Sequence, residues 1–294
     1  MVSGISIGVL VTKFILDLSV VTIGVFGVFS MFYFKIETKS NMKGYVVVVM
    51  LLNIFSCLQV IFSTIYLAQE NQNVCNFEAA FINFVQYAQL LWLLTTAVEF
   101  LLAQMELVVK SVKRSLVTHV VIWTFCFCIS IPVYMKPCAL EFATCVPTTN
   151  GIRWGVCIVP EFIMCFLIIG VSCAMFVHKS MQYTGLISFI TFWTLRDGET
   201  QEIAKNALLN SLFYIVLGLT EMQTPFTLMF QRVLPTPISV IKTLFLASTD
   251  AWCCLVTVIY FSYLFGFLHQ WQTIVKNFEK KRNSATDLEN IHLL

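Results

Sequence analysis

Seven apolar stretches, each close to or above the length that crosses a lipid bilayer, divide this sequence. A helix needs about 20 apolar residues to cross roughly 30 Å of hydrocarbon. With 58% hydrophobic and 12% charged residues among 294, the chain has too little polar surface to coat a soluble domain of this size. We therefore expect an all-α membrane protein in which residues 1–265 form a seven-helix transmembrane bundle. The predicted spans lie near residues 9–34, 44–67, 77–109, 116–134, 154–177, 203–230 and 238–264.

Lysine and arginine concentrate in alternate loops between these spans. If the N-terminus lies outside, the inner segments hold thirteen of them and the outer loops three. Cytoplasmic loops retain positive charge, so we expect an extracellular N-terminus, a cytoplasmic C-terminus and a multi-pass protein of the plasma membrane. Residues 266–294 then form a cytoplasmic tail, and 267–282 has the pattern of an amphipathic helix at the membrane surface. Topology accounts for the net charge of +2, and nothing indicates nucleic acid as a partner.

Three of the eleven cysteines lie outside the predicted spans: Cys75 before the third span, and Cys138 and Cys145 in the loop after the fourth. In the predicted topology this side of the membrane is oxidising, which favours a disulfide from Cys75 to one of the two loop cysteines. A local Cys138–Cys145 bridge that leaves Cys75 free is the alternative, because sequence does not determine connectivity. Pairing with Cys75 would hold the loop over the mouth of the bundle.

Polar residues recur along the third predicted span at near-helical spacing, and single polar residues stand in the other spans. Inside a membrane such residues face the bundle interior or a cavity. Taken singly, each is explained by a hydrogen bond between helices, and together they predict a polar-cored bundle. They are Asn83, Gln86, Gln89, Thr96, Glu99 and Glu106 in the third span, and Asp17, Asn53, Glu161, Glu221, Gln223 and Asp250 elsewhere.

A subset of these residues predicts a ligand pocket at the outer mouth. Its carboxylates suit a cationic or polar small molecule. Pro160 and Pro225 cannot donate to the helix ladder, so we expect motion to be focused there, with a static kink as the alternative. The predicted pocket residues are Asn83, Gln86, Gln89, Glu161, Glu221 and Gln223.

The arrangement resembles rhodopsin-like G-protein-coupled receptors. Glu99 follows Cys75 by 24 residues, which is similar to the register between the disulfide cysteine and the acid of the Asp/Glu-Arg-Tyr motif in that family. More closely, VEFLLAQ resembles a degenerate Glu-Arg-x-x-Ala signature of nematode serpentine chemoreceptors. The resemblance implies a chemoreceptor-like receptor for a small molecule, with a heterotrimeric G protein as partner beside the lipid bilayer. Other landmarks of the family match Asn53, Trp123, Pro132, Pro160, Pro225 and Asp250.

Two departures from that pattern concern the switch of such receptors. Phe100 stands where the family has arginine, and Asp250-Ala251-Trp252-Cys253-Cys254 replaces Asn/Asp-Pro-x-x-Tyr. The resemblance implies a switch role for Asn53, Glu99, Phe100 and Asp250, but Phe100 cannot pair with Glu99. We therefore expect the usual ionic contact to be missing. Either activation uses other pairs, such as Glu106 with Lys110, or the receptor is an orphaned, constitutive or non-coupling member.

Other protein classes have weaker support in the sequence. The four histidines are dispersed without ligand-spaced partners, and neither a nucleophile elbow nor a phosphate-binding glycine loop is present, so we expect no enzyme, metal or cofactor. A lysine in the seventh span could bind retinal, as in the opsins. Lys242, however, precedes Asp250 by eight residues, whereas the retinal-binding lysine of that family precedes its Asn or Asp by six, so we expect Lys242 to extend to the outer membrane surface instead. A solute transporter or channel subunit is the main alternative, because the buried acids could line a path for a cation or an organic solute.

Overall fold

The fold is that of a computed structural model of the 294-residue chain. The structure describes residues 4–34, 41–105, 107, 111–141, 144–184, 198–222, 225, 229, 255–257, 259, 260 and 270–276.

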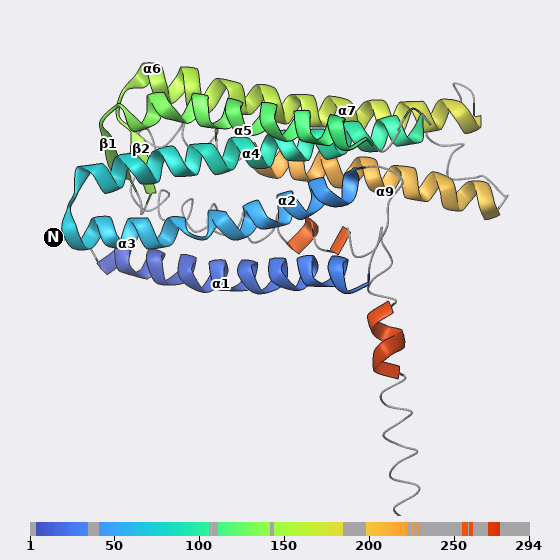
Figure 1. The fold of residues 1–294 in the computed structure, drawn as a ribbon, viewed down its shortest axis with the longest axis horizontal. Helices are drawn as coiled ribbons and strands as arrows, with labels where there is room; N and C mark the ends of the chain where they lie inside the picture. Colours follow the sequence, from blue (N-terminus) through green and yellow to red (C-terminus); the bar gives the residue numbers. More distant parts are fainter. Residues whose placement is uncertain are drawn as a thin grey trace, which may run out of the picture.

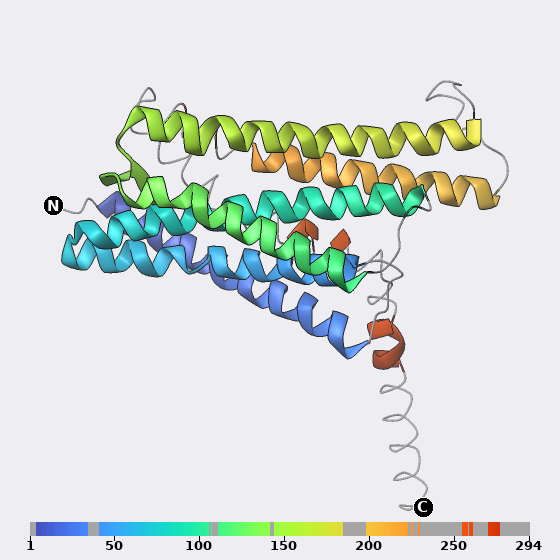
Figure 2. The same ribbon diagram turned by 45° about the horizontal axis from the view of Figure 1, so that its top comes forward.

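Long helices run back and forth through the molecule, and a short β-hairpin covers one end (Figures 1 and 2). We call the end with the hairpin the hairpin end, and the other the far end. The helices are α1 (Gly4–Tyr33), α2 (Met42–Ser56), α3 (Gln59–Gln69), α4 (Gln72–Gln104), α5 (Val112–Tyr134), α6 (Asn150–Ile152), the π-helical turn η1 (Arg153–Ile158), α7 (Val159–Thr184) and α9 (Gly198–Glu221). The hairpin pairs β1 (Cys138–Glu141) with antiparallel β2 (Thr144–Pro147).

Within the described ranges, five helical segments are long and apolar enough, by length and composition, to cross a membrane. They are Val11–Tyr33, Met42–Tyr66, Gln72–Gln104, Val112–Tyr134 and Asn150–His178. The predicted helical, multi-pass character is thereby supported. At the sixth predicted span α9 carries a shorter apolar segment, Leu208–Glu221. Most of the seventh predicted span lies outside the described residues, and its described part, 255–257, 259 and 260, is helical.

The second predicted span is two helices rather than one. Between α2 and α3 the Cys57 N–H bonds to the Ile54 carbonyl at 3.2 Å, a tighter i to i+3 pattern. The Asn53 carbonyl, which a continuous helix would offer to the Cys57 N–H, accepts the Ser56 hydroxyl at 2.7 Å and lies 3.4 Å from the Cys57 sulfur. Such bonds from side chains back to the helix compete with the backbone ladder and bend it.

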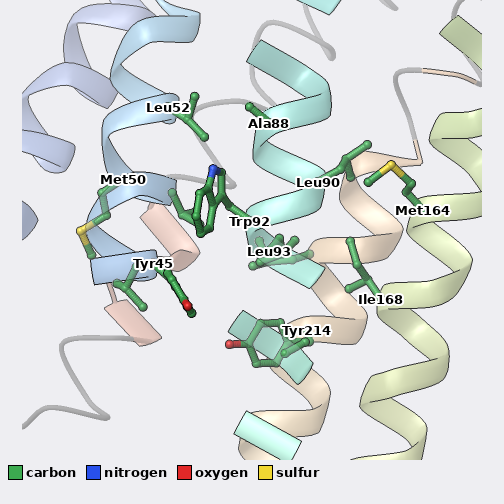
Figure 3. Packing of buried hydrophobic residues seen from close by; sticks show 14 of the residues in the cluster. Tyr45, Met50, Leu52, Ala88, Leu90, Trp92, Leu93, Met164, Ile168 and Tyr214 are labelled. Atoms are coloured by element: carbon green, nitrogen blue, oxygen red, sulfur yellow. The ribbon is translucent and has the colours of Figure 1, made fainter. Parts of the chain in front are cut away.

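Helix α4 is the centre of the bundle and contacts α2, α3, α5, α7 and α9. Figure 3 shows Trp92 on the α2 side of α4, and Leu90 on the side of Met164 and Ile168. Trp92 packs on Tyr45 of α2 at 5.2 Å between ring centroids, and every one of these side chains is buried. The residues of α4 therefore have protein neighbours on several sides.

A polar turn sets where α4 begins. Glu70 ends α3 in the left-handed region with φ of 49°, and the Asn71 side chain then accepts the Asn73 N–H at 3.0 Å. An asparagine in this N-cap position satisfies one of the free amides of the first turn. Cys75 is thereby placed in the first turn of α4, next to the hairpin.

The described part of the predicted amphipathic tail, 270–276, is helical. Trp271 donates its indole N–H to Ser30 of α1 at 3.1 Å and stacks on Phe26 and Tyr33, with ring centroids 5.9 and 5.4 Å away. The segment is therefore attached to the end of α1.

Candidate functional site

A disulfide joins the hairpin to the central helix. Cys75 of α4 is bonded to Cys145 of β2, with 5.4 Å between their Cα atoms, which confirms the predicted link between the third span and the following loop. In the hairpin Cys138 faces Pro147, whereas Cys145 faces Leu140. Cys138 and Cys145 are therefore diagonal neighbours at about 7–8 Å, beyond the usual reach of a disulfide. The alternative Cys138–Cys145 bridge does not form.

Glu78 makes a second connection between α4 and the hairpin, and the sequence analysis missed it. Its fully buried carboxylate accepts the Ser63 hydroxyl of α3 at 2.6 Å and the Cys145 N–H at 3.3 Å. Lys13 of α1 contributes an attractive charge. Glu78 follows Cys75 by three residues and shares its helix face, so Cys145 is held at two points. The i, i+3 spacing of Cys75 and Glu78 was the signal in the sequence that could have revealed this contact. Glu78 was not considered, because it stood at the very start of the predicted span, which began at residue 77.

Cys138 remains a thiol in this structure and is buried beside the disulfide. Burial, together with the nearby Glu78, raises the pKa of Cys138 to about 11. As a buried thiol, Cys138 is therefore protonated at neutral pH.

The polar residues predicted to line one pocket along α4 turn toward different helices. Asn83 donates to the Ser130 hydroxyl of α5 at 3.3 Å, and Gln89 donates to Asn53 of α2 at 3.1 Å. Gln86 is partly buried on the same helix. Because α4 has neighbours on several sides, near-helical spacing did not imply a common cavity.

Two of the predicted pocket acids lie within electrostatic range of one another on the packed helices α7 and α9. Glu161 is 1% exposed, and its charge interacts with that of Glu221 at the end of α9. The Oε2 atom of Glu161 has no hydrogen-bond partner among the described residues. Tyr87 of α4 and Cys165 of α7 lie within electrostatic range of Glu161. Gln223, also predicted here, lies outside the described residues.

Pro160 lies just after the π-helical turn η1, at the entry to α7. Proline has no N–H to give to the carbonyl four residues earlier, which is that of Val156. The Tyr87 hydroxyl of α4 donates a hydrogen bond to this carbonyl. The irregular turn η1 is thus bonded to α4 at Val156, five residues before Glu161. Pro225, the second predicted bend, is buried beyond the end of α9.

Near the far end Glu99 has a cationic partner on another helix. The Arg114 Nη2 atom lies 2.5 and 2.6 Å from the two carboxylate oxygens of Glu99. Glu99 is 6% exposed and Arg114 37%. Phe100 packs against the hydrophobic core instead. Phe100 thus supplies no cation to Glu99. The cation comes instead from Arg114 of α5, a pairing that the sequence did not predict.

The start of α5 is fixed by polar contacts that bring Arg114 into place. Ser111 caps α5 by accepting the Arg114 N–H at 3.3 Å, and the Ser111 carbonyl accepts the Asn41 side chain at 3.1 Å. Asn41 precedes α2, so α2, α4 and α5 meet in one polar network. The other predicted switch residues, Asp250, Glu106 and Lys110, lie outside the described residues.

The site thus has two parts: the acids Glu161 and Glu221, of which Glu161 is within electrostatic range of Tyr87, and the Glu99–Arg114 pair toward the far end. Among the residues that the structure describes, no three His, Cys, Asp or Glu side chains are grouped as a metal site would require. Comparison of the sequence with protein-family models and with curated proteins gives no match.

Proposed function

We propose that the protein is a seven-transmembrane, chemoreceptor-like receptor of the plasma membrane. It binds a small molecule in the half of the bundle nearer the hairpin end, and it signals at its far end. The excess of lysine and arginine in alternate loops supports an extracellular hairpin end and a cytoplasmic far end. A heterotrimeric G protein is the proposed partner of the cytoplasmic side.

The pair of acids supports a ligand site between α4, α7 and α9. A buried carboxylate oxygen without a hydrogen-bond partner is costly, and a ligand that donates a hydrogen bond or carries positive charge would lower that cost. Glu161 meets this description among the described residues. Glu161 directly follows Pro160, and the Tyr87 hydroxyl of α4 bonds to the Val156 carbonyl just before α7. A ligand bound at Glu161 would therefore affect the packing of both α4 and α7. The proposed ligand is therefore a small cation or hydrogen-bond donor.

The Glu99–Arg114 pair is the observation that carries the proposal. A receptor needs two packings of the bundle and a contact that favours one of them. A salt bridge between α4 and α5, linked through Ser111 to the start of α2, is such a contact. We propose that it holds the inactive packing and that it replaces the pair lost through Phe100.

The test is ligand-independent G-protein activation in cells, compared at equal surface expression for wild type, Glu99→Gln, Arg114→Gln and Lys113→Gln. Lys113 is the exposed neighbour of Arg114 and controls for the loss of one positive charge. We expect several-fold higher basal activation for the first two variants and no change for Lys113→Gln. Absence of activation by every variant across a panel of Gα subunits would contradict the receptor proposal.

A solute transporter or channel subunit is the second candidate, and one observation favours it. Lys13, Asp17 and Glu78 are all buried in the helices of the hairpin half, which is unusual for charged side chains within membrane-spanning segments. Flux of small organic cations into proteoliposomes containing the purified protein tests this candidate. Uptake that Glu78→Gln abolishes would favour transport over reception.

A further inference from the structure

We propose that Cys138 and Cys157 form a second disulfide, which joins β1 of the hairpin to the start of the α7 segment. Four of the six buried residues in the small hydrophobic cluster at the hairpin end are cysteines: Cys75, Cys138, Cys145 and Cys157. Two of them already form the Cys75–Cys145 bridge. The remaining two are both buried, belong to the same cluster and interact electrostatically with one another.

The neighbours of these two sulfurs favour pairing with each other. Cys138 is excluded from Cys145 by the strand register, and Cys75 is already bonded. The Cys138 sulfur lies 3.5 and 3.8 Å from the backbone carbonyls of Lys136 and Val133, so only weak S–H bonds would be given up. The existing bridge also indicates that this end of the protein folds in an oxidising compartment.

The proposed bond forms during folding, since the folded cluster buries both sulfurs. The oxidant is the active-site disulfide of a dithiol oxidoreductase of the secretory compartment. The Cys138 thiolate attacks that disulfide and releases one oxidoreductase thiolate, which gives a mixed disulfide. The Cys157 thiolate then attacks the Cys138 sulfur and releases the second oxidoreductase thiolate. Two protons and two electrons leave the two cysteines, and the oxidoreductase disulfide becomes two thiols.

The second bridge would give the hairpin a link to each side of the candidate ligand site. Cys75–Cys145 ties β2 to α4, and Cys138–Cys157 would tie β1 to η1. Cys157 is next to Val156, whose carbonyl receives the Tyr87 hydroxyl. The hairpin would then fix α4 relative to the irregular start of α7. This inference concerns covalent structure and stands whether or not the protein is a receptor.

The experiment is a thiol map of the full-length protein expressed in eukaryotic cells. The protein is denatured in light N-ethylmaleimide without reductant, then reduced and labelled with the heavy form. Chymotryptic cleavage after Phe142 and Trp154 separates Cys138, Cys145 and Cys157 onto different peptides. We expect heavy label at Cys75, Cys138, Cys145 and Cys157, light label at the other seven cysteines, and a linked 138–157 peptide pair before reduction. Light label at Cys138 and Cys157, or a link from either to Cys75 or Cys145, would overturn the proposal.

Variants check the pairing independently. Cys138→Ser is expected to convert Cys157 from heavy to light label while Cys75 and Cys145 stay heavy. Cys128→Ser, at an exposed position of α5, is the matched control and should leave the heavy set unchanged. If Cys138→Ser does not fold, Cys157→Ser gives the reciprocal result at Cys138, and the wild-type map remains decisive. Heavy label at Cys157 in folded Cys138→Ser would overturn the proposed partner.

Discussion

Single residues in this bundle are positioned by partners that lie far away in the sequence. The depth of Glu99 in an apolar segment correctly indicated a residue that needs a partner. The partner itself could not be predicted, because Arg114 is 15 residues away on another helix. In the sequence Arg114 was explained by topology alone, as one of the positive residues of an inner loop. A salt bridge between helices depends on how the helices pack, and helical spacing along one chain segment does not contain that information.

Glu78 provides a test of stability at this scale. Glu78→Gln removes the charge that accepts the Ser63 hydroxyl and the Cys145 N–H, and buried hydrogen bonds to a charged group are worth about 1–3 kcal/mol. We expect a lower thermal midpoint of the detergent-purified protein. Glu70→Gln, at an exposed position eight residues earlier, removes the same charge and should leave the midpoint unchanged. Equal midpoints for the two variants would contradict the role given to Glu78.

At the scale of elements, the sequence predicted where apolar segments lie but not how each one is built. The second predicted span is divided at Cys57 because side chains occupy the Asn53 carbonyl, and the fifth begins with a π-helical turn next to Pro160. Proline predicted an irregularity at that point. Hydropathy averages over about 20 residues and does not detect such local competition for hydrogen bonds.

Close packing of α9 on α7 depends on Gly218. A Cβ atom at this position would lie 3.0 Å from Ile169 Cγ1 and 3.5 Å from the Cys165 carbonyl oxygen. We expect Gly218→Leu to separate the two helices and to destabilise the protein by about 1–3 kcal/mol, as overpacking does. Gly170→Leu is the matched control, because nothing lies within 4 Å of its added Cβ. Thermal unfolding in detergent measures both, and an unchanged midpoint for Gly218→Leu would contradict this packing.

Attachment of the 270–276 helix to α1 depends on Trp271. Trp271→Ala removes the hydrogen bond to Ser30 and the stacking on Phe26 and Tyr33, where each aromatic pair contributes about 0.5–1.5 kcal/mol. We expect trypsin to cleave after Lys276 several-fold faster than in wild type. Gln272→Ala, on an exposed position of the same helix, should cleave at the wild-type rate. Equal rates for wild type and Trp271→Ala would show that the helix is held by other contacts.

For the whole molecule, composition and apolar segments predicted a helical, multi-pass membrane protein. Among the residues that it describes, the structure has five helical segments with the length and apolarity to span a bilayer. The disulfide between α4 and the hairpin was also predicted in outline, although only the strand register explains why Cys145 is bonded and Cys138 is not paired with it. The pocket was predicted less well. Because α4 has neighbours on several sides, Asn83 and Gln89 make contacts with α5 and α2. Glu161 and Glu221 lie within electrostatic range of one another on α7 and α9.

We propose that the Glu99–Arg114 salt bridge stabilises an inactive packing of the helices in a receptor. A charge exchange tests it most directly, by measuring basal G-protein activation for Glu99→Arg, Arg114→Glu and the double variant at equal surface expression. Each single variant places like charges together and should raise basal activation several-fold, whereas the double variant restores an opposite pair and should return it toward the wild-type level. A double variant as active as the sum of the two single variants, or no effect of any of the three, would contradict the claim.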